Sequence, residues 1–139
     1  MGKIPNFTES RSAGARLGSA YIGVTKNGSL SIYAGFYSKN GIKSFSHCLL
    51  LIDKAQNLIG IQFGGNELGD GAYTLNHDVN HKTAGVSAGN FFTYNGLSPL
   101  SWYGKYPPEK FDDETRKNVF MLDLDQKIAV NRKSRKLQN

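Results

Sequence analysis

Three histidines, one cysteine and a run of acidic residues are the side chains of this sequence that could do chemistry. His77 and His81 lie four residues apart in NHDVNH, and on one face of a helix or strand two imidazoles could bind a metal ion. A complete site needs a third ligand, such as Asp78 or His47, and the sequence has neither an HExxH pattern nor paired cysteines. A polar turn with two exposed histidines explains the motif more simply, so we expect no metal and no cofactor.

The spacing of the other reactive groups does not favour an enzyme. Cys48 directly follows His47, and neighbours on a strand point to opposite faces, so the two cannot form a catalytic dyad. A solvated acidic loop and an ordinary strand edge explain the residues that could be taken as a magnesium cluster, which are Asp112, Asp113, Glu114, Asp123 and Asp125.

The net charge of +6 is concentrated at the two ends of the chain. Residues 126–139 contain five Lys or Arg and no acid, and residues 1–18 contain three basic residues and one acid, whereas residues 19–125 contain nine basic and ten acidic residues. We therefore expect disordered tails over 1–18 and 126–139 around a single globular domain over 19–125. The C-terminal tail would either bind polyanions by charge or only solubilise the protein, and its candidate phosphate contacts are Arg132, Lys133, Arg135 and Lys136.

The hydrophobic pattern of the middle predicts β-strands. AYIGVTK and SLSIYA flank Asn27-Gly28, which predicts a hairpin with a type I′ turn. The continuous apolar run SHCLLLID predicts a strand covered on both faces, and LIGIQF, AYTLNHDV, TAGVSA and NVFMLDLD predict further strands. YPPEKFDDETRK, with two prolines and an acidic run, predicts a loop. No segment predicts a long amphipathic helix.

Two similar segments, AGFYSKNGI at 34–42 and AGNFFTYNGL at 88–97, indicate an internal duplication. Each predicts a short helix that buries Phe36 or Phe91 and ends at a left-handed glycine, Gly41 or Gly96. An apolar residue after each glycine, Ile42 or Leu97, would pack back on the last turn. The fold we expect is mainly β with short helices, in which two β-β-α-β-β halves over 20–63 and 72–124 form one barrel-like or curved-sheet core.

The first half resembles the AbrB/SpoVT type of DNA-binding domain. The resemblance rests on VTKNGSLSI, FYSKNGI and LLLIDKAQNLIGIQF, and it covers 20–63 well and 72–124 loosely. It implies a swapped-hairpin barrel built by one chain, or a ring of the MraZ kind, with DNA contacts beside the first turn of each half. Lys26 and Lys82 occupy those turns here.

KNGSLSI, LLLIDKA, YTLNHDV and AGVSAGNFF are also similar to Whirly-type and coactivator-type single-stranded-DNA-binding domains. That resemblance implies a curved sheet with exposed aromatics for base stacking and lysines for phosphates. The residues that would play these parts are Tyr21, Tyr33, Phe36, Tyr37, Lys26 and Lys39.

We therefore expect a non-enzymatic nucleic-acid-binding protein, a small DNA-binding regulator of bacterial or phage type. Trp102 and Tyr103 lie in an aromatic, proline-rich loop that would either contact a ligand or fold over the core. The alternatives are a Whirly-like single-strand binder and a structural or interaction module. No apolar run approaches the length of a membrane span and no secretory signal is evident, so we expect a cytoplasmic protein. We also expect the protein to form a homo-oligomer. The candidate nucleic-acid contacts inside the domain are Lys26, Lys39, Lys43, Lys82, Tyr33, Tyr37, Trp102 and Lys105.

Overall fold

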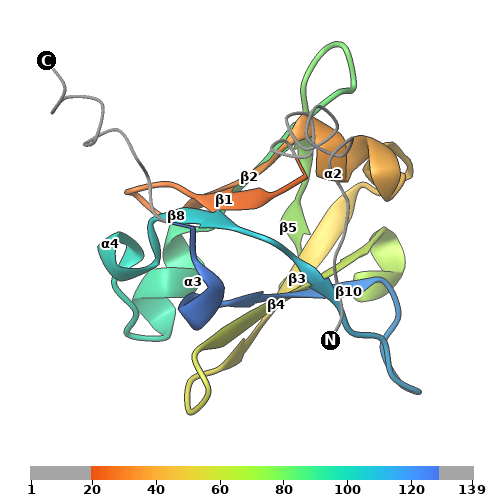
Figure 1. Cartoon of the computed structure of the whole chain (residues 1–139). Coiled ribbons are helices and arrows are strands. Elements are labelled where there is room, and N and C mark those ends of the chain that lie inside the picture. The colour runs from red at the N-terminus through yellow and green to blue at the C-terminus, as the bar shows by residue number, and fades with distance from the viewer. Residues whose placement is uncertain (1–19, 129–139) are drawn as a thin grey trace, which may run out of the picture.

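The computed structural model describes residues 20–128, and its architecture is mainly β with short helices, as predicted (Figure 1). The strands are β1 (Ile22–Val24), β2 (Ser29–Ile32), β3 (His47–Asp53), β4 (Leu58–Gly64), β5 (Tyr73–Thr74), β6 (Asn76–His77), β7 (Ala84–Ser87), β8 (Gly104–Tyr106), β9 (Glu109–Lys110) and β10 (Val119–Asp123). The helices are α2 (Ala34–Lys39), α3 (Gly89–Tyr94) and α4 (Pro99–Trp102), with 3-10 turns η1 (Ile42–Ser44), η2 (Asn66–Leu68) and η3 (Leu124–Gln126). Within the described range, no helix has the length and apolar character needed to cross a membrane.

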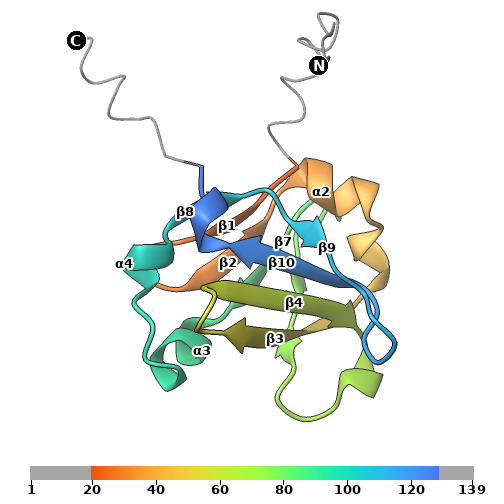
Figure 2. The same cartoon turned by 60° about the horizontal axis from the view of Figure 1, so that its bottom comes forward.

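The strands form two antiparallel sheets with the core between them (Figure 2). Sheet A has the order β6-β7-β2-β1-β8, and sheet B has the order β5-β3-β4-β10-β9. Two segments pass from one sheet to the other, because only Leu75 separates β5 from β6 and only Pro107-Pro108 separates β8 from β9. The ladders do not join into a closed barrel, so of the two predicted forms the barrel does not occur among the described residues.

The period of two along each strand decides which side chains enter the core. In sheet A, Ile22 and Val24 of β1 and Leu30 and Ile32 of β2 point inward and are buried. In sheet B the inward set is Ile59, Ile61 and Phe63 of β4 with Phe120 and Leu122 of β10. Both halves of the chain thus contribute to one hydrophobic core. The short helices α2 and α3 lie at opposite ends of it.

The register of β2 against β7 within sheet A shows the predicted duplication. In sheet A, β2 pairs with β7, and Ser31 lies opposite Gly85. A twofold rotation about that pair exchanges the Leu30–Val86 pair with the Ile32–Ala84 pair, so the two halves meet symmetrically. The other strand pairs follow the same twofold symmetry. The last strands of the two halves, β4 and β10, pair with each other. The pairing of β3 in the first half with β5 in the second corresponds to the pairing of β8 in the second half with β1 in the first.

The two Asn-Gly motifs end helices, as predicted. Gly41 and Gly96 have φ of 62° and 66°, in the left-handed region that favours glycine. In both halves the side-chain amide of the preceding asparagine also donates a hydrogen bond to the helix. Asn40 Nδ2 donates to the Phe36 carbonyl at 3.1 Å, and Asn95 Nδ2 donates to the Phe91 carbonyl at 2.9 Å. The apolar residues after the glycines, Ile42 and Leu97, pack on the core.

The β1–β2 hairpin exists, but the prediction of a type I′ turn is wrong. The Gly28 N–H donates to the Thr25 carbonyl at 3.1 Å, so the central residues of the turn are Lys26 and Asn27. Only Gly28 has a positive φ, of 92°. The Thr25 hydroxyl accepts from the Ser29 N–H and donates to the Asn27 side chain, which stabilises this longer connection.

Two other boundaries differ from expectation. The segment predicted as a loop contains the edge strand β9, in which Lys110 pairs with Phe120, and prolines are tolerated at such an edge. Order also continues past residue 125, because the Ile128 N–H donates to the Lys105 carbonyl at 2.8 Å. The rest of the predicted tails, over 1–18 and from 129 onward, lies outside the described residues.

Strand β3 is not covered on both faces by the residues that the structure describes. Its inward side chains, Cys48, Leu50 and Ile52, belong to the core or pack against it. Leu49 and Leu51 point to the outer face of sheet B and stay partly exposed. The continuous apolar run therefore reflects one core face and one apolar outer face.

Candidate nucleic-acid interface

The outer face of sheet A presents a row of residues that crosses four strands, and three of the four are small. The registers place Gly85 beside Ser31, Ser31 beside Gly23, and Gly23 beside Lys105. Because side chains alternate across a strand, these residues all point away from the core.

Tyrosines and lysines stand on this floor around β1 and β8. A Cβ atom on Gly23 would lie 3.3 Å from Cε1 of Tyr33, so the Tyr33 ring rests directly over the glycine. The Lys105 ammonium lies 5.2 Å from the Tyr33 ring centroid and 6.0 Å from that of Tyr21. All three side chains are half-buried, with part of their surface open to a ligand.

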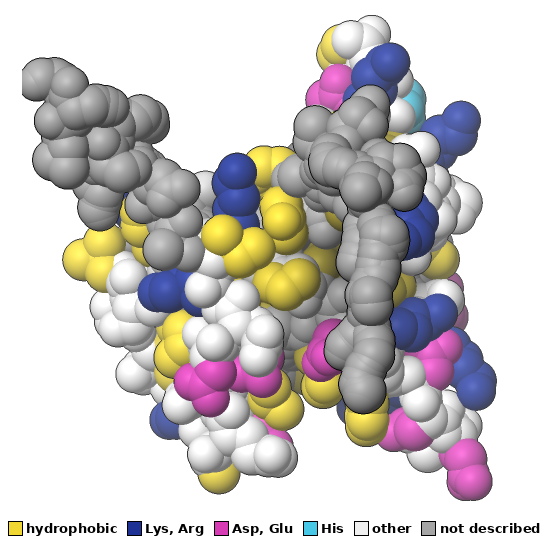
Figure 3. Space-filling model, viewed as in Figure 1, with side chains coloured by type: hydrophobic (Ala, Val, Ile, Leu, Met, Phe, Trp, Pro, Cys, Tyr) yellow, Lys and Arg dark blue, Asp and Glu magenta, His cyan; other side chains and the backbone are white. Residues whose placement is uncertain are grey.

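A second pair of the same kind lies at the β1–β2 turn. The Lys26 ammonium lies 5.4 Å from the Tyr103 ring centroid. Tyr103 and Tyr33 both line a hollow of about 320 Å³ that has Gly23 in its lining. We call Tyr21, Gly23, Lys26, Tyr33, Tyr103 and Lys105 the tyrosine–lysine face. Figure 3 shows hydrophobic side chains, a class that includes tyrosine, with Lys or Arg among them over β1 and β8.

The basic C-terminal segment begins beside this face. Ile128 is the last described residue and pairs with Lys105 at the edge of sheet A. Lys127 donates from Nζ to the Ser101 carbonyl at 2.9 Å, next to the same edge. The four predicted tail contacts, Arg132, Lys133, Arg135 and Lys136, lie outside the described residues.

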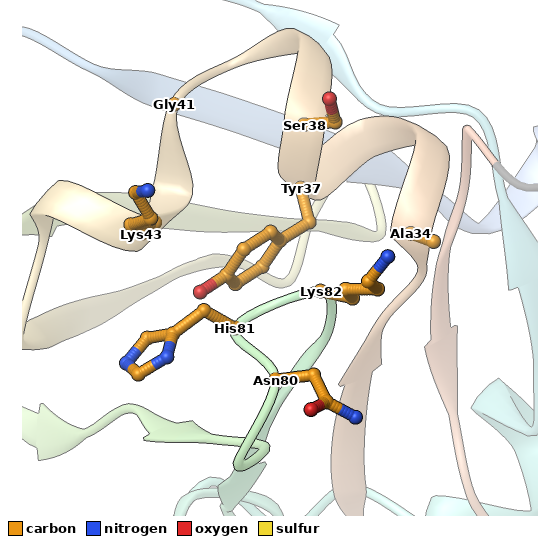
Figure 4. Close-up of a pocket in the computed structure, with 8 residues that line it drawn as sticks. All are labelled: Ala34, Tyr37, Ser38, Gly41, Lys43, Asn80, His81 and Lys82. Carbon is orange, nitrogen blue, oxygen red and sulfur yellow. The ribbon is translucent and has the colours of Figure 1, made fainter.

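Three of the other candidates gather around a separate hollow of about 520 Å³ (Figure 4). Tyr37 of α2 is its floor, Lys43 comes from η1, and Lys82 comes from the connection between β6 and β7. Tyr37 is only 3% exposed, so its ring cannot stack on a base. Burial and the nearby Asp78 carboxylate raise the pKa of its hydroxyl.

The remaining two candidates join neither group. Lys39 lines a third depression with Lys110, on the other side of α2. Trp102 is 3% exposed and packs on Tyr106 with ring centroids 5.9 Å apart. The aromatic loop thus folds over the core at Trp102, whereas the neighbouring Tyr103 is half-buried.

The histidine motif forms a structural network. The His77 Nε2 lies 2.7 Å from the Phe45 carbonyl, which can only accept, so Nε2 donates. In the neutral ring Nδ1 is then an acceptor for the Tyr37 hydroxyl at 2.7 Å. Both nitrogens are engaged, and the His81 ring stacks on His77 at 5.7 Å. No group of three potential metal ligands occurs among residues 20–128.

The cysteine, His47 and two of the acidic residues that could have served in catalysis or metal binding make contacts within the fold. Burial raises the pKa of the Cys48 thiol to about 12, and the His47 Nδ1 interacts instead with the Ser46 hydroxyl at 2.7 Å. The N–H groups of Arg116 and Thr115 hold the pKa of the Asp113 carboxyl below its usual value. The Val119 N–H does the same for Asp112. These carboxylates stabilise turns.

Comparison of the chain with models of protein families, with curated proteins and with solved structures found no match. The tyrosine–lysine face therefore has to be judged from its own geometry. Gly23 is the one member of this face that was not among the residues predicted from the sequence. The period of two would have found it, since Tyr21, Gly23, Ser31 and Tyr33 alternate with the buried residues of two adjacent strands.

Proposed function

We propose that this protein binds single-stranded nucleic acid on the tyrosine–lysine face and is not an enzyme. The observation that carries the proposal is the position of Lys105, over the rings of both Tyr21 and Tyr33 on an outward sheet face. Proteins that bind single strands combine aromatic platforms for bases with cations that follow the backbone. This face offers both within one hollow.

In the proposed complex, bases stack on Tyr33 and Tyr103 while Lys105 and Lys26 contact phosphates. Gly23 leaves room for the Tyr33 ring over the sheet, because a larger side chain there would displace that ring. Stacking tolerates any base, so the proposed recognition has little sequence preference. The residues from 129 onward add positive charge from the edge at Ile128.

The test is equilibrium binding of a fluorescein-labelled single-stranded oligonucleotide, followed by anisotropy at low salt. Tyr33→Ala should weaken binding by about 5- to 150-fold, which corresponds to about 1–3 kcal/mol for one stacked base. Tyr94→Ala is the matched control, because Tyr94 is 88% exposed on α3, away from this face. If the intact protein binds no oligonucleotide, or if the two alanine variants bind alike, the proposal is wrong.

Salt dependence tests the lysines separately. Each lysine that neutralises a phosphate of a single strand contributes about 0.7 to the slope of log K against log salt. Lys105→Gln should reduce the slope by about that amount, and deletion of residues 129–139 should reduce it further. Lys54→Gln, in the β3–β4 turn, should leave the slope unchanged.

Double-stranded DNA is the alternative ligand that the AbrB-like resemblance implies. Its two turn lysines, Lys26 and Lys82, follow β1 and precede β7, at opposite ends of sheet A. Competition with a duplex of the same sequence decides between the ligands. If the duplex binds more tightly and Tyr33→Ala has no effect, the turns and not the tyrosines are the binding surface.

A second candidate function, self-assembly, is favoured by the outer face of sheet B. Leu51, Gly60 and Met121 lie side by side on three strands, with Leu51 packed over the glycine. Together with them, Leu58 and Phe111 line a hollow of about 410 Å³, with Asp53 and Gln56 at its polar edge, and Phe111 is 52% exposed. We propose that a second copy of the chain covers this apolar face.

Light scattering tests this candidate. Met121→Lys should lower the mass of the assembly, whereas Leu100→Lys, at a 66% exposed position on α4, should not. A wild-type protein that is monomeric at high concentration would exclude the second candidate and leave the first untouched.

A further inference from the structure

The hollow between α2, η1 and the β6–β7 connection is lined by hydrogen-bond donors (Figure 4). Lys43 and Lys82 flank the Tyr37 ring, and Asn80 and His81 come from the connection. None of the side chains that line the hollow is acidic. Its volume of about 520 Å³ lies within the usual range for small-ligand pockets.

The connection that forms one wall is fixed by a carboxylate. Asp78 accepts hydrogen bonds from the backbone N–H groups of Lys82 at 2.7 Å, Thr83 at 2.9 Å and Asn80 at 3.2 Å. The Thr83 and Lys82 N–H groups are the main causes that hold the pKa of Asp78 below its usual value. The negative charge of Asp78 thus serves the loop itself and leaves the lysine side chains to the hollow.

The backbone of the wall stores strain at the residue that faces the hollow. His81 has a φ of 52°, a left-handed conformation that costs a residue with a side chain about 1–2 kcal/mol. Glycine would adopt it without that cost. Strained backbone residues of this kind cluster at ligand-binding and active sites. In this loop the left-handed conformation places the His81 imidazole, which stacks on the His77 ring, in the lining of the hollow.

The equivalent place in the other half is closed. There the β1–β2 connection spans only residues 25–28 and packs on α3, since a Cβ atom on Gly28 would lie 3.1 Å from the Phe92 ring. The β6–β7 connection spans residues 78–83 and stands away from α2. Duplication alone therefore does not explain the hollow, which is specific to the longer and strained loop.

We propose that this hollow binds a phosphate monoester, with Lys43 and Lys82 on its oxygens and His81 and Asn80 as further donors. Such a group is carried by a free nucleotide and by the 5′ end of a nucleic-acid strand. The two sources share one chemistry. Ala34, which lines the hollow, directly follows Tyr33 of the tyrosine–lysine face in the chain. Binding of a free nucleotide does not depend on the function proposed above.

The experiment is calorimetric titration of the full chain with adenosine monophosphate, with adenosine as the ligand that lacks the phosphate. The wild type should bind the nucleotide saturably and the nucleoside at least tenfold more weakly. The Lys43→Gln/Lys82→Gln double variant should lose at least tenfold in affinity, and Lys39→Gln, on the other side of α2, should lose none. His81→Gly keeps the backbone conformation and should weaken binding severalfold while the protein stays folded.

Nucleotide and nucleoside binding alike, or a double variant that binds like the wild type, would overturn the proposal. A second comparison, of 5′-phosphorylated and 5′-hydroxyl oligonucleotides, identifies the source of the phosphate. A preference for the phosphorylated strand that the double variant abolishes places a strand end in the hollow, and no preference assigns it to free nucleotides. Tyr33→Ala should weaken both oligonucleotides equally, so a failure of the tyrosine–lysine face stays distinguishable from a failure of this site.

Discussion

Substitution of Gly28 by alanine is expected to be the most damaging of three otherwise similar glycine changes. Gly28, Gly41 and Gly96 have φ of 92°, 62° and 66°, so alanine is strained at each position. The space around them differs. A Cβ atom on Gly28 would lie 3.1 Å from Phe92 Cδ2 and 3.2 Å from the Gly89 Cα, whereas nothing lies within 4 Å at the other two.

The expected magnitudes follow from these contacts. The left-handed conformation alone costs about 1–2 kcal/mol, and the smaller entropy of the unfolded alanine chain returns about 0.4–1 kcal/mol. Gly41→Ala and Gly96→Ala should therefore cost about 1 kcal/mol each. Gly28→Ala adds overpacking of about 1–3 kcal/mol, because the backbone of α3 cannot move aside as a flexible side chain would. Its total is about 2–4 kcal/mol.

Urea unfolding monitored by the fluorescence of the buried Trp102 measures the free energy of unfolding of all three variants, and thermal unfolding followed by the same signal measures their Tm. At about 4 °C per kcal/mol for a domain near this size, Gly28→Ala should lower Tm by about 8–16 °C and Gly41→Ala by about 4 °C. If Gly28→Ala costs no more than Gly41→Ala, the packing of the β1–β2 turn on α3 is wrong, and with it the reason why only one of the two hollows is closed.

Three further outcomes are expected. Asn40→Ala and Asn95→Ala should each lower the free energy of unfolding by about 0.5–1.5 kcal/mol in urea titrations, since each removes one side-chain bond to a helix carbonyl. Asp78→Asn should be less stable than the wild type at neutral pH. Because folding lowers the pKa of Asp78, its contribution is complete above the unfolded pKa of about 3.9 and is lost as pH falls through the folded pKa, so Tm scans at descending pH should converge. Cys48, buried and with a raised pKa, should resist a thiol reagent in the folded protein and react once urea unfolds it; rapid native labelling would contradict its placement.

Local signals in the sequence predicted the parts of the fold that depend on local structure. The repeated Asn-Gly predicts a helix end because the left-handed conformation and the asparagine bond involve only neighbouring residues. The turn after β1 was predicted as a turn but with the wrong type, because its geometry depends on Thr25 and on contact between Gly28 and α3. The pairing of β3 with β5 and of β8 with β1 could not be predicted, because both halves have similar strand patterns.

The candidate site also has parts that local sequence predicts and parts that depend on tertiary packing. Alternation in the β1–β2 hairpin predicts that Tyr21 and Tyr33 share a face, but only the pairing of β1 with β8 brings Lys105 to them. The sequence pattern around Trp102 was equally compatible with contact to a ligand, but tertiary packing buries the side chain. Lys43 and Lys82 are brought to one hollow by the long connection between β6 and β7, whose strained shape gives no signal in the sequence.

Nuclear magnetic resonance titration with a single-stranded oligonucleotide tests the central claim most directly, because it reports which backbone amides sense the ligand. The largest chemical-shift changes are expected at Gly23, Ser31, Tyr33 and Lys105 on the outer face of sheet A. The amides of β3 and β4 in sheet B should stay unchanged. Changes confined to sheet B, or no changes at low salt, would contradict the assignment of the tyrosine–lysine face as a nucleic-acid interface.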